Sequence, residues 1–325
     1  MVTAPLQEIS MKTSVNYEKL TFHVILRDIV IVVLLICTAL LAKAVIEQKR
    51  VIAEDERYFS AESTRTFIYA NEGDRIYIPD SEYGEIWYAA ETDVPLHGLD
   101  FSNVREKDGL KGYYEGDTCI TKNGIDVSYF QGDIDWERVK AAGIDFAILR
   151  VGYRGYETGN ITLDSKFHEY AKGAAAAGIE TGAYFFSQAV SIEEAAEEAK
   201  FVMDEIQGYS MTYPVVFDWE PIGGDTSRTT DVPVRTLNSC ARVFCNALAR
   251  GGYIPMVYTN RRMGLVRFDP SEIAGFDVWI ADYREETYYP YSFAIWQYAS
   301  DGEVDGIDTP VDLNMSFIDY TKVRR

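Results

Sequence analysis

Two acidic residues stand at the end of an apolar run in the segment PVVFDWEPIGG, residues 214–224. The run 215–217 favours a buried strand, because β-branched and aromatic side chains pack well on a pleated sheet. Side chains two apart on a strand point to the same face, so Asp218 and Glu220 share a face from which Trp219 points away. Paired carboxyl groups suit general acid and base chemistry. Two solvated acids at a strand end are the simpler alternative, and the rest of the chain decides between them.

The elements that position this pair alternate between strand and helix from residue 124 onwards. We expect strands at 124–130, 146–153, 180–187, 214–220, 254–259, 276–283, 293–299 and 311–317, and helices at 135–143, 166–178, 191–208 and 235–252. Asp135 is placed to cap the first helix, and Ser191 with Glu194 forms a capping box for the third. Five strand–helix units followed by three strands with little helix between them predict an α/β fold, an irregular (β/α)5(β)3 TIM-like barrel.

Further acids lie on the first and last of these strands. Asp126 stands within the first strand and Asp312 within the last, and these two strands are neighbours in a closed barrel. Barrel active sites lie at the carboxyl ends of the strands, where Asp218 and Glu220 are also expected. Each of Asp126 and Asp312 alone is better explained as a cap or turn residue. Together, four carboxyl groups around one cavity raise the pKa of at least one member and point to cleavage of a glycosidic bond.

Several segments resemble a known family. They are GIDVSYFQGDIDWERVKAAGIDFAILRVGYR, AAGIETGAYFFSQA, EAAEEAKFVMDEIQGYSMTYPVVFDWEP, GGYIPMVYT, WIADY and IWQYASDGEVDGIDTPVDLN. In this order, over residues 122–317, they resemble the glycoside hydrolase family 25 lysozymes, also called Chalaropsis-type N-acetylmuramidases. The resemblance implies a peptidoglycan hydrolase that cleaves the β-1,4 bond between N-acetylmuramic acid and N-acetylglucosamine in a peptidoglycan glycan strand.

The resemblance also implies roles for single residues. The D-x-E pair of the family falls on Asp218 and Glu220, with Glu220 as the general acid and Asp218 assisting. The acid of the opening GIDVS falls on Asp126, and that of the closing VDLN falls on Asp312. The third strand reads YFF where the family often has YHF, which affects polar contacts from this strand. Three aromatic residues are candidates for stacking on sugar, with a core role as the alternative for each: Tyr184, Trp296 and Tyr298.

Two other functions remain open at this point: a wall-binding module that does not cleave, and a barrel hydrolase acting on another N-acetylated glycan. The chain contains only three histidines, and it has no CxxC, HExxH or GxxxxGK[ST] string. We therefore expect neither a metal nor a cofactor. A formal net charge of −20 argues against nucleic acid as a partner. Cys37, Cys119, Cys240 and Cys245 do not form a disulfide framework and favour burial as small apolar residues.

The first part of the chain indicates export. Residues 29–46 are apolar apart from Lys43 and predict a transmembrane signal anchor. Residues 1–28, which precede it, are then a cytoplasmic segment. A cleaved signal peptide and a buried core helix are the alternatives. Residues 47–118 predict a stalk and a small β-rich module of unknown role, and residues 119–325 the catalytic barrel. The expected location is the cell membrane, with the barrel outside a Gram-positive-type cell.

Overall fold

The computed structural model describes residues 75–80, 84–89, 93–222 and 227–323. The segment predicted as a membrane anchor, residues 29–46, lies outside these residues, as does Cys37. Within the described part, no helix has the length and apolar character needed to cross a bilayer.

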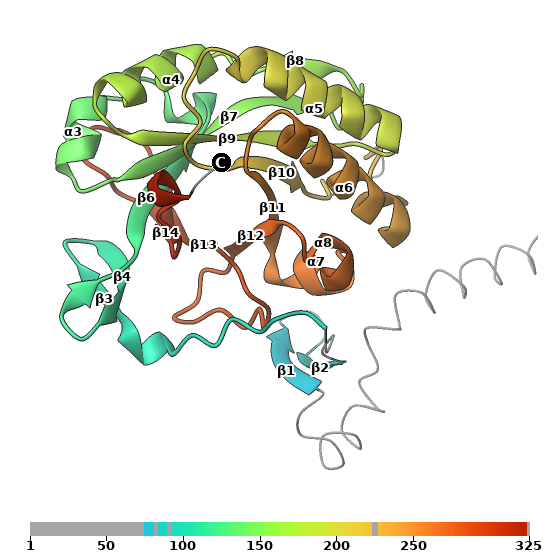
Figure 1. Cartoon of the computed structure of the whole chain (residues 1–325), viewed down its shortest axis with the longest axis horizontal. Coiled ribbons are helices and arrows are strands. Elements are labelled where there is room, and N and C mark those ends of the chain that lie inside the picture. Colours follow the sequence, from blue (N-terminus) through green and yellow to red (C-terminus); the bar gives the residue numbers. More distant parts are fainter. Residues whose placement is uncertain (1–74, 81–83, 90–92, 223–226, 324–325) are drawn as a thin grey trace, which may run out of the picture. The chain divides into compact units, whose positions relative to one another are not determined.

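Eight strands close into a barrel (Figure 1). They are β6 (Lys122–Val127), β7 (Phe146–Arg154), β9 (Glu180–Ser187), β10 (Val215–Trp219), β11 (Pro255–Asn260), β12 (Asp277–Ala281), β13 (Ile295–Gly302) and β14 (Val311–Ser316). The first seven of these strands run parallel to one another, and β14 closes the ring antiparallel to both β13 and β6. The predicted eight-stranded barrel is therefore confirmed, and its order along the chain matches the expected one.

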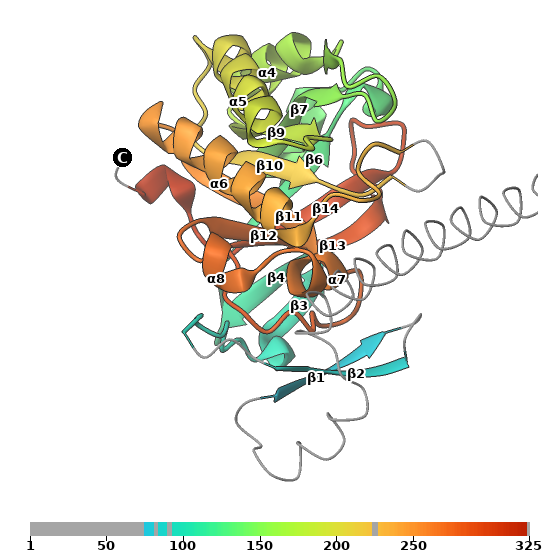
Figure 2. The same ribbon diagram turned by 90° about the vertical axis from the view of Figure 1, so that its right-hand side faces the viewer.

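Helices cover the outside of the barrel after its first five strands. They are α3 (Trp136–Ala141), α4 (Phe167–Ala176), α5 (Ile192–Ile206), α6 (Val234–Arg250), α7 (Arg261–Val266) and α8 (Pro270–Ile273). As the sequence predicts, the Asp135 side chain accepts from the backbone N–H of Arg138 and the Ser191 hydroxyl accepts from that of Glu194. The predicted capping box is incomplete, because the Glu194 carboxylate accepts from the backbone N–H of Val190 instead of that of Ser191. Helices α5 and α6 lie side by side over β9 and β10 (Figure 2). The short strand β8 (Ile161–Leu163), antiparallel to β7, and the two short helices α7 and α8 were not predicted.

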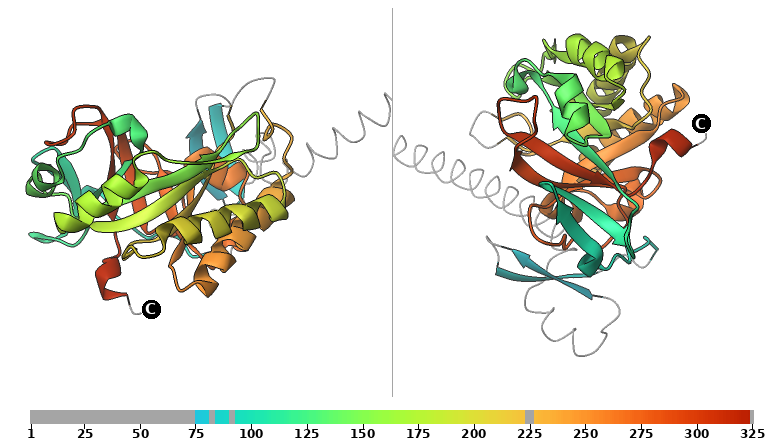
Figure 3. Two further views of the ribbon diagram at one scale, coloured as in Figure 1. Left: turned by 90° about the horizontal axis from the view of Figure 1, so that it is seen from above. Right: turned by 90° about the vertical axis from the view of Figure 1, so that its left-hand side faces the viewer.

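The chain ahead of the barrel contains two further sheets. Strands β1 (Arg75–Asp80) and β2 (Gly84–Ala89) form an antiparallel pair. A 3₁₀ turn, Phe101–Asn103, then precedes a three-stranded sheet of β3 (Val104–Lys107), β4 (Leu110–Glu115) and β5 (Thr118–Cys119). Strand β4 contacts β6 and β14 (Figure 3, right). The three-stranded sheet therefore belongs to the packing of the barrel wall, while the predicted division at residues 118 and 119 stays a prediction.

Residues 93–119 also contact the outer face of β13 and the loop before it. The Phe101 ring meets Trp296 edge-on with centroids 5.5 Å apart, and the backbone N–H of Lys111 donates to the Tyr298 hydroxyl at 3.2 Å. A backbone bond from Ser292 to Pro95, 2.8 Å long, fixes the loop before β13. Residues 93–119 thus cover aromatic side chains that the barrel would otherwise expose.

The cysteines with described positions are all free thiols. Cys240 and Cys245 are buried on α6, in agreement with their predicted role as small apolar residues. Cys119 is exposed on β5 and is not such a residue.

Candidate active site

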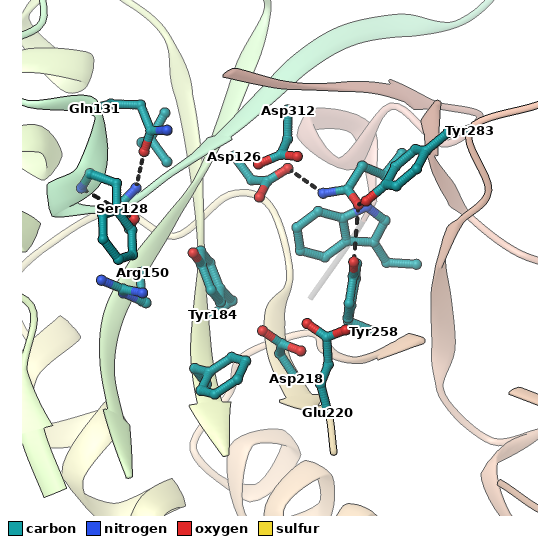
Figure 4. Close-up of a pocket in the computed structure, with 15 residues that line it drawn as sticks. Asp126, Ser128, Gln131, Arg150, Tyr184, Asp218, Glu220, Tyr258, Tyr283 and Asp312 are labelled. Atoms are coloured by element: carbon teal, nitrogen blue, oxygen red, sulfur yellow. Dashed lines mark hydrogen bonds between the residues drawn. The ribbon is translucent and has the colours of Figure 1, made fainter. Parts of the chain in front are cut away.

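A cavity of about 330 Å³ lies at the carboxyl ends of the parallel barrel strands, beside the amino end of the antiparallel β14 (Figure 4). It is lined by Asp126, Val127, Ser128, Phe130, Gln131, Arg150, Tyr184, Phe186, Asp218, Glu220, Tyr258, Trp279, Tyr283, Gln297 and Asp312. All four predicted acids line this one cavity although they come from three different strands and span almost 190 residues of sequence. The structure therefore brings together the carboxyl groups that the sequence analysis selected.

Asp126 and Asp312 face each other across the junction that closes the barrel. They are directly paired in the antiparallel register of β6 and β14. Asp126 Oδ2 accepts hydrogen bonds from the side-chain amides of Gln297 and Asn314, both 2.8 Å long. These two amides hold the Asp126 carboxyl in one orientation, and their bonds favour its ionised form.

The D-x-E pair ends β10 as the strand pattern predicts. Asp218 and Glu220 both line the cavity, while the Trp219 indole points away and donates to the carbonyl oxygen of Ala189 at 3.0 Å. Asp218 Oδ1 is buried and has no hydrogen-bond partner among the described residues. A buried acceptor left in this state is costly, so it indicates a position where a ligand donor binds.

Burial raises the pKa of all four acids, and repulsion by neighbouring acids raises it further for Asp218, Glu220 and Asp312. Desolvation is the main cause in each case, and it raises the pKa of Asp126 to about 6 and that of Asp312 to about 8. Burial and then the Asp126 charge raise the pKa of Glu220. Burial, Glu220 and Asp126 raise the pKa of Asp218 well above its ordinary range, while Arg150 lowers it. The cavity therefore retains protons at neutral pH, as general acid catalysis requires.

The Asp312→Asn variant should gain thermal stability relative to the unaltered protein as the pH rises. The Asp312 pKa is about 8 in the folded chain against an ordinary value of 3.8, so the folded state binds this proton more tightly. The stability linked to the proton is complete below the unfolded value and is lost as the pH rises through about 8. Thermal unfolding of both proteins from about pH 4 to pH 9 should show a growing difference in melting temperature, about 2–4 °C per kcal/mol relieved. A difference independent of pH would contradict the shift.

The aromatic lining differs in part from the predicted one. Tyr184 faces the cavity, as predicted (Figure 4). Trp296 and Tyr298 do not: both are buried on the outer face of β13, where they meet residues 93–119. Gln297 between them points inward and binds Asp126. The prediction of sugar stacking for Trp296 and Tyr298 is thus corrected by the alternation of side chains along β13.

Sequence analysis missed several residues of the wall. These are Arg150, Tyr258, Trp279, Tyr283, Gln297 and Asn314, of which Asn314 contacts the site through Asp126. Tyr258 and Tyr283 both donate their hydroxyls to Gln297 Oε1, at 3.0 and 2.9 Å. The period of two was the available signal, since Asn314 stands two residues after Asp312 and Gln297 is a polar residue between two aromatic residues of β13.

One further residue holds the end of β10. Gln188 is fully buried, and its Nε2 donates to the backbone carbonyl of Glu220 at 2.6 Å and to that of Ser187 at 2.9 Å. Its Oε1 accepts from the Thr229 hydroxyl at 3.3 Å. Gln188 therefore links the end of β10 to Thr229 and fixes the backbone from which the Glu220 side chain extends.

A metal ion has no ready-made site in the described part of the chain, where no group of three or more His, Cys, Asp or Glu side chains has a ligating arrangement. The expectation that no metal or cofactor is needed stays a prediction.

Known proteins resemble this chain in the barrel region. The autolytic lysozyme of Clostridium acetobutylicum is 26% identical over 192 residues, which are 59% of this chain and 54% of that protein. Lysozyme M1 of Streptomyces globisporus is 28% identical over 206 residues, 59% of this chain and 66% of that protein. The crystal structure of a bacterial lysozyme from Streptomyces coelicolor superposes with a TM-score of 0.51 at 26% identity, covering 59% of this chain and 90% of that one. The chain thus matches about half the length of the autolytic lysozyme.

The family model described as glycosyl hydrolases family 25 matches residues 125–307, more than half of the 325 residues. This range contains Asp126 and the D-x-E pair, and it stops just before the strand that carries Asp312. With the barrel and its acid cavity, the match shows that the chain belongs to glycoside hydrolase family 25.

Proposed function

We propose that the protein is a peptidoglycan hydrolase, a muramidase that cleaves the β-1,4 bond between N-acetylmuramic acid and N-acetylglucosamine. The observation that carries the proposal is the cavity in which four carboxyl groups with raised pKa values converge at the barrel mouth. Glycosidic bond cleavage uses paired carboxyl groups of this kind. The lysozyme names of two relatives support peptidoglycan as the substrate.

In the proposed mechanism, Glu220 protonates the glycosidic oxygen of the leaving sugar. Burial and the Asp126 charge raise the Glu220 pKa, which keeps the proton available. The unpartnered Oδ1 of Asp218 accepts the N–H of the 2-acetamido group. This bond orients the acetamido oxygen for attack on the anomeric carbon and favours an ionised Asp218 that stabilises the developing positive charge. Water then opens the cyclic intermediate, and the anomeric configuration is retained.

Digestion of purified peptidoglycan tests the proposed activity. Residues 47–325 are incubated with the polymer, and the sugar at each new reducing end is identified. A muramic acid end supports the proposal, and an N-acetylglucosamine end redirects it to another bond of the glycan strand. If no reducing end forms while the protein remains on the polymer, the chain is a binding module and the proposed activity is wrong.

Gln188→Ala should lower kcat by roughly 10-fold with little change in KM, because the Glu220 backbone loses a hydrogen bond worth on the order of 1 kcal/mol. The Gln188 side chain contacts that backbone and is buried away from solvent. Steady-state kinetics on soluble glycan fragments measures both constants. Gln207→Ala, an exposed position at the end of α5, is the matched control. A rise in KM that accounts for the whole loss would show that Gln188 does not position the acid.

We also propose that residues 29–46 anchor the enzyme in the cell membrane with the barrel outside. The apolar character of this segment supports the proposal, as does the extracellular position of a peptidoglycan substrate. Protease added to cells stripped of their wall should digest the barrel and leave a membrane-bound fragment. The same treatment after detergent lysis is the control. A barrel that is protected in stripped cells and digested after lysis would contradict the orientation.

A further inference from the structure

The cavity wall contains a buried cation with an unused hydrogen-bond donor. Arg150 of β7 lines the same cavity as the four acids and is only 9% exposed. Its Nε donates to Asp164 Oδ2 at 2.7 Å, but Nη2 is buried and has no hydrogen-bond partner among the described residues. A guanidinium carries five N–H donors and accepts no hydrogen bond, so its missing partner must be an acceptor.

A second arginine on the same strand shows what complete pairing looks like. Arg154 donates to Glu198, Glu197 and two backbone carbonyls, and it lies on the outer side of the barrel towards α5. A register shift between Arg150 and Gly152 separates the two arginines. Such a bulge reverses the alternation of side chains, so Arg150 faces inward and Arg154 outward although they are four residues apart. Of these two arginines on β7, the one in the cavity has a buried donor without a partner.

The surroundings of Arg150 hold its side chain in place. Its guanidinium carbon lies 5.0 Å from the Tyr129 ring centroid, 5.3 Å from that of Phe130 and 5.5 Å from that of Tyr153. Its ion-pair partner Asp164 is itself fixed by the backbone N–H groups of Tyr129 and Lys166, at 3.1 and 2.9 Å. The guanidinium is thus presented in one orientation, which lowers the entropy lost on binding a ligand.

The order of the strands relates Arg150 to the proposed reaction centre. Strand β9 lies between β7 and β10, so Tyr184 stands between Arg150 and Asp218 on the wall (Figure 4). The backbones of β7 and β10 are therefore about 10 Å apart, two strand spacings. The Arg150 charge reaches this far, because it lowers the pKa of Asp218. A sugar ring whose 2-acetamido group lies at Asp218 can direct the substituent of its next carbon towards Arg150.

We propose that Arg150 selects muramic acid by binding the acyl oxygen of the lactyl ether on carbon 3, whether this is a free carboxylate or the amide of a peptide stem. The inference rests on the proposed function. N-acetylglucosamine carries only a hydroxyl at this carbon, which offers no charge-assisted or bidentate bond to a guanidinium. Among the described residues that line the cavity, Arg150 is the only cation. An acyl oxygen turned towards the acids instead would meet carboxyl groups.

Binding in a Glu220→Gln background tests this assignment without turnover. The probes are glycan strands with peptide stems, the same strands stripped of peptides, and the N-acetylglucosamine tetramer, each titrated by calorimetry. Arg150→Met should weaken binding of both muramic strands by roughly 10- to 100-fold, the loss of a charge-assisted bond, and leave the tetramer unchanged. Arg154→Lys, which alters an arginine outside the cavity, should preserve the ratio of these affinities.

The outcomes separate the assignment from the proposed function. Equal losses for muramic strands and tetramer, or no loss, overturn the role of Arg150 while the muramidase activity stands. Failure of the Glu220→Gln protein to bind any glycan, together with no release of reducing ends by the unaltered enzyme, overturns the proposed function itself. If Arg150→Met does not fold, Arg150→Lys keeps the charge beside Asp164 and lacks the planar fork, and it should still lose affinity for peptide-bearing strands.

Discussion

Replacing Glu220 by glutamine is expected to lower the turnover of peptidoglycan by roughly 10²- to 10⁴-fold, the contribution of a general acid. Glutamine keeps the shape of the side chain and removes the proton that the glycosidic oxygen needs. The Glu220 backbone is held by Gln188, so the substitution should leave the end of β10 in place. Release of reducing ends from purified peptidoglycan measures the loss, and the melting temperature confirms folding.

A change of leaving group separates this role from a structural one. An aryl glycoside whose phenol leaves without protonation should recover most of the lost rate in the Glu220→Gln protein. Glu137→Gln, an exposed position on α3, is the matched control and should be active on both substrates. Near-normal turnover of peptidoglycan by a folded Glu220→Gln protein would overturn the assignment of the acid.

Asp218→Asn should reduce turnover by about 10²- to 10³-fold, in the range seen when a group that stabilises transition-state charge is lost. The asparagine side chain has no negative charge to offer the positive charge that develops at the anomeric carbon. Its amide also places a donor where the acetamido N–H needs an acceptor. In the unaltered protein, Asp218 Oδ1 is buried without a partner in the described part of the chain, so this atom is free to accept that bond.

The aryl glycoside also tests the role of Asp218, and here we expect the opposite of the result for Glu220→Gln. Asp218 does not protonate the leaving oxygen, so the aryl glycoside should not rescue Asp218→Asn. Asp204→Asn, an exposed position on α5, is the matched control. Rescue of Asp218→Asn by the leaving group would assign the acid to Asp218 in place of Glu220. An inverted product from the unaltered enzyme would exclude attack by the acetamido group.

The barrel and its acids were predictable because both depend on short-range patterns. The alternation of apolar strands with capped helices predicted all eight barrel strands, and the period of two placed Asp218 and Glu220 on one face. The same period does not say which face of β13 lines the cavity, and the stacking prediction for Trp296 and Tyr298 was wrong because both faces of this strand are buried. One face meets the cavity and the other meets residues 93–119, and composition alone does not distinguish a strand buried on both faces.

The inward position of Arg150 could not be predicted from the sequence, for a related reason. Its strand is apolar almost throughout, and the bulge after Arg150 changes which face each later residue occupies. No local sequence pattern predicts this register shift. The roles of Gln297 and Asn314 could not be predicted either, because both side-chain amides act by binding Asp126. This residue lies more than 170 positions away in the sequence from the nearer of the two.

The contacts of residues 93–119 with the barrel limit where a soluble fragment of this protein can begin. The family match begins at residue 125, and a fragment chosen from it would lose residues 93–119 and uncover Trp296, Tyr298 and Phe317. A contiguous aromatic patch of this kind promotes aggregation. A truncated barrel that precipitates would then reveal nothing about its chemistry, whereas a fragment that begins before residue 93 keeps the patch covered.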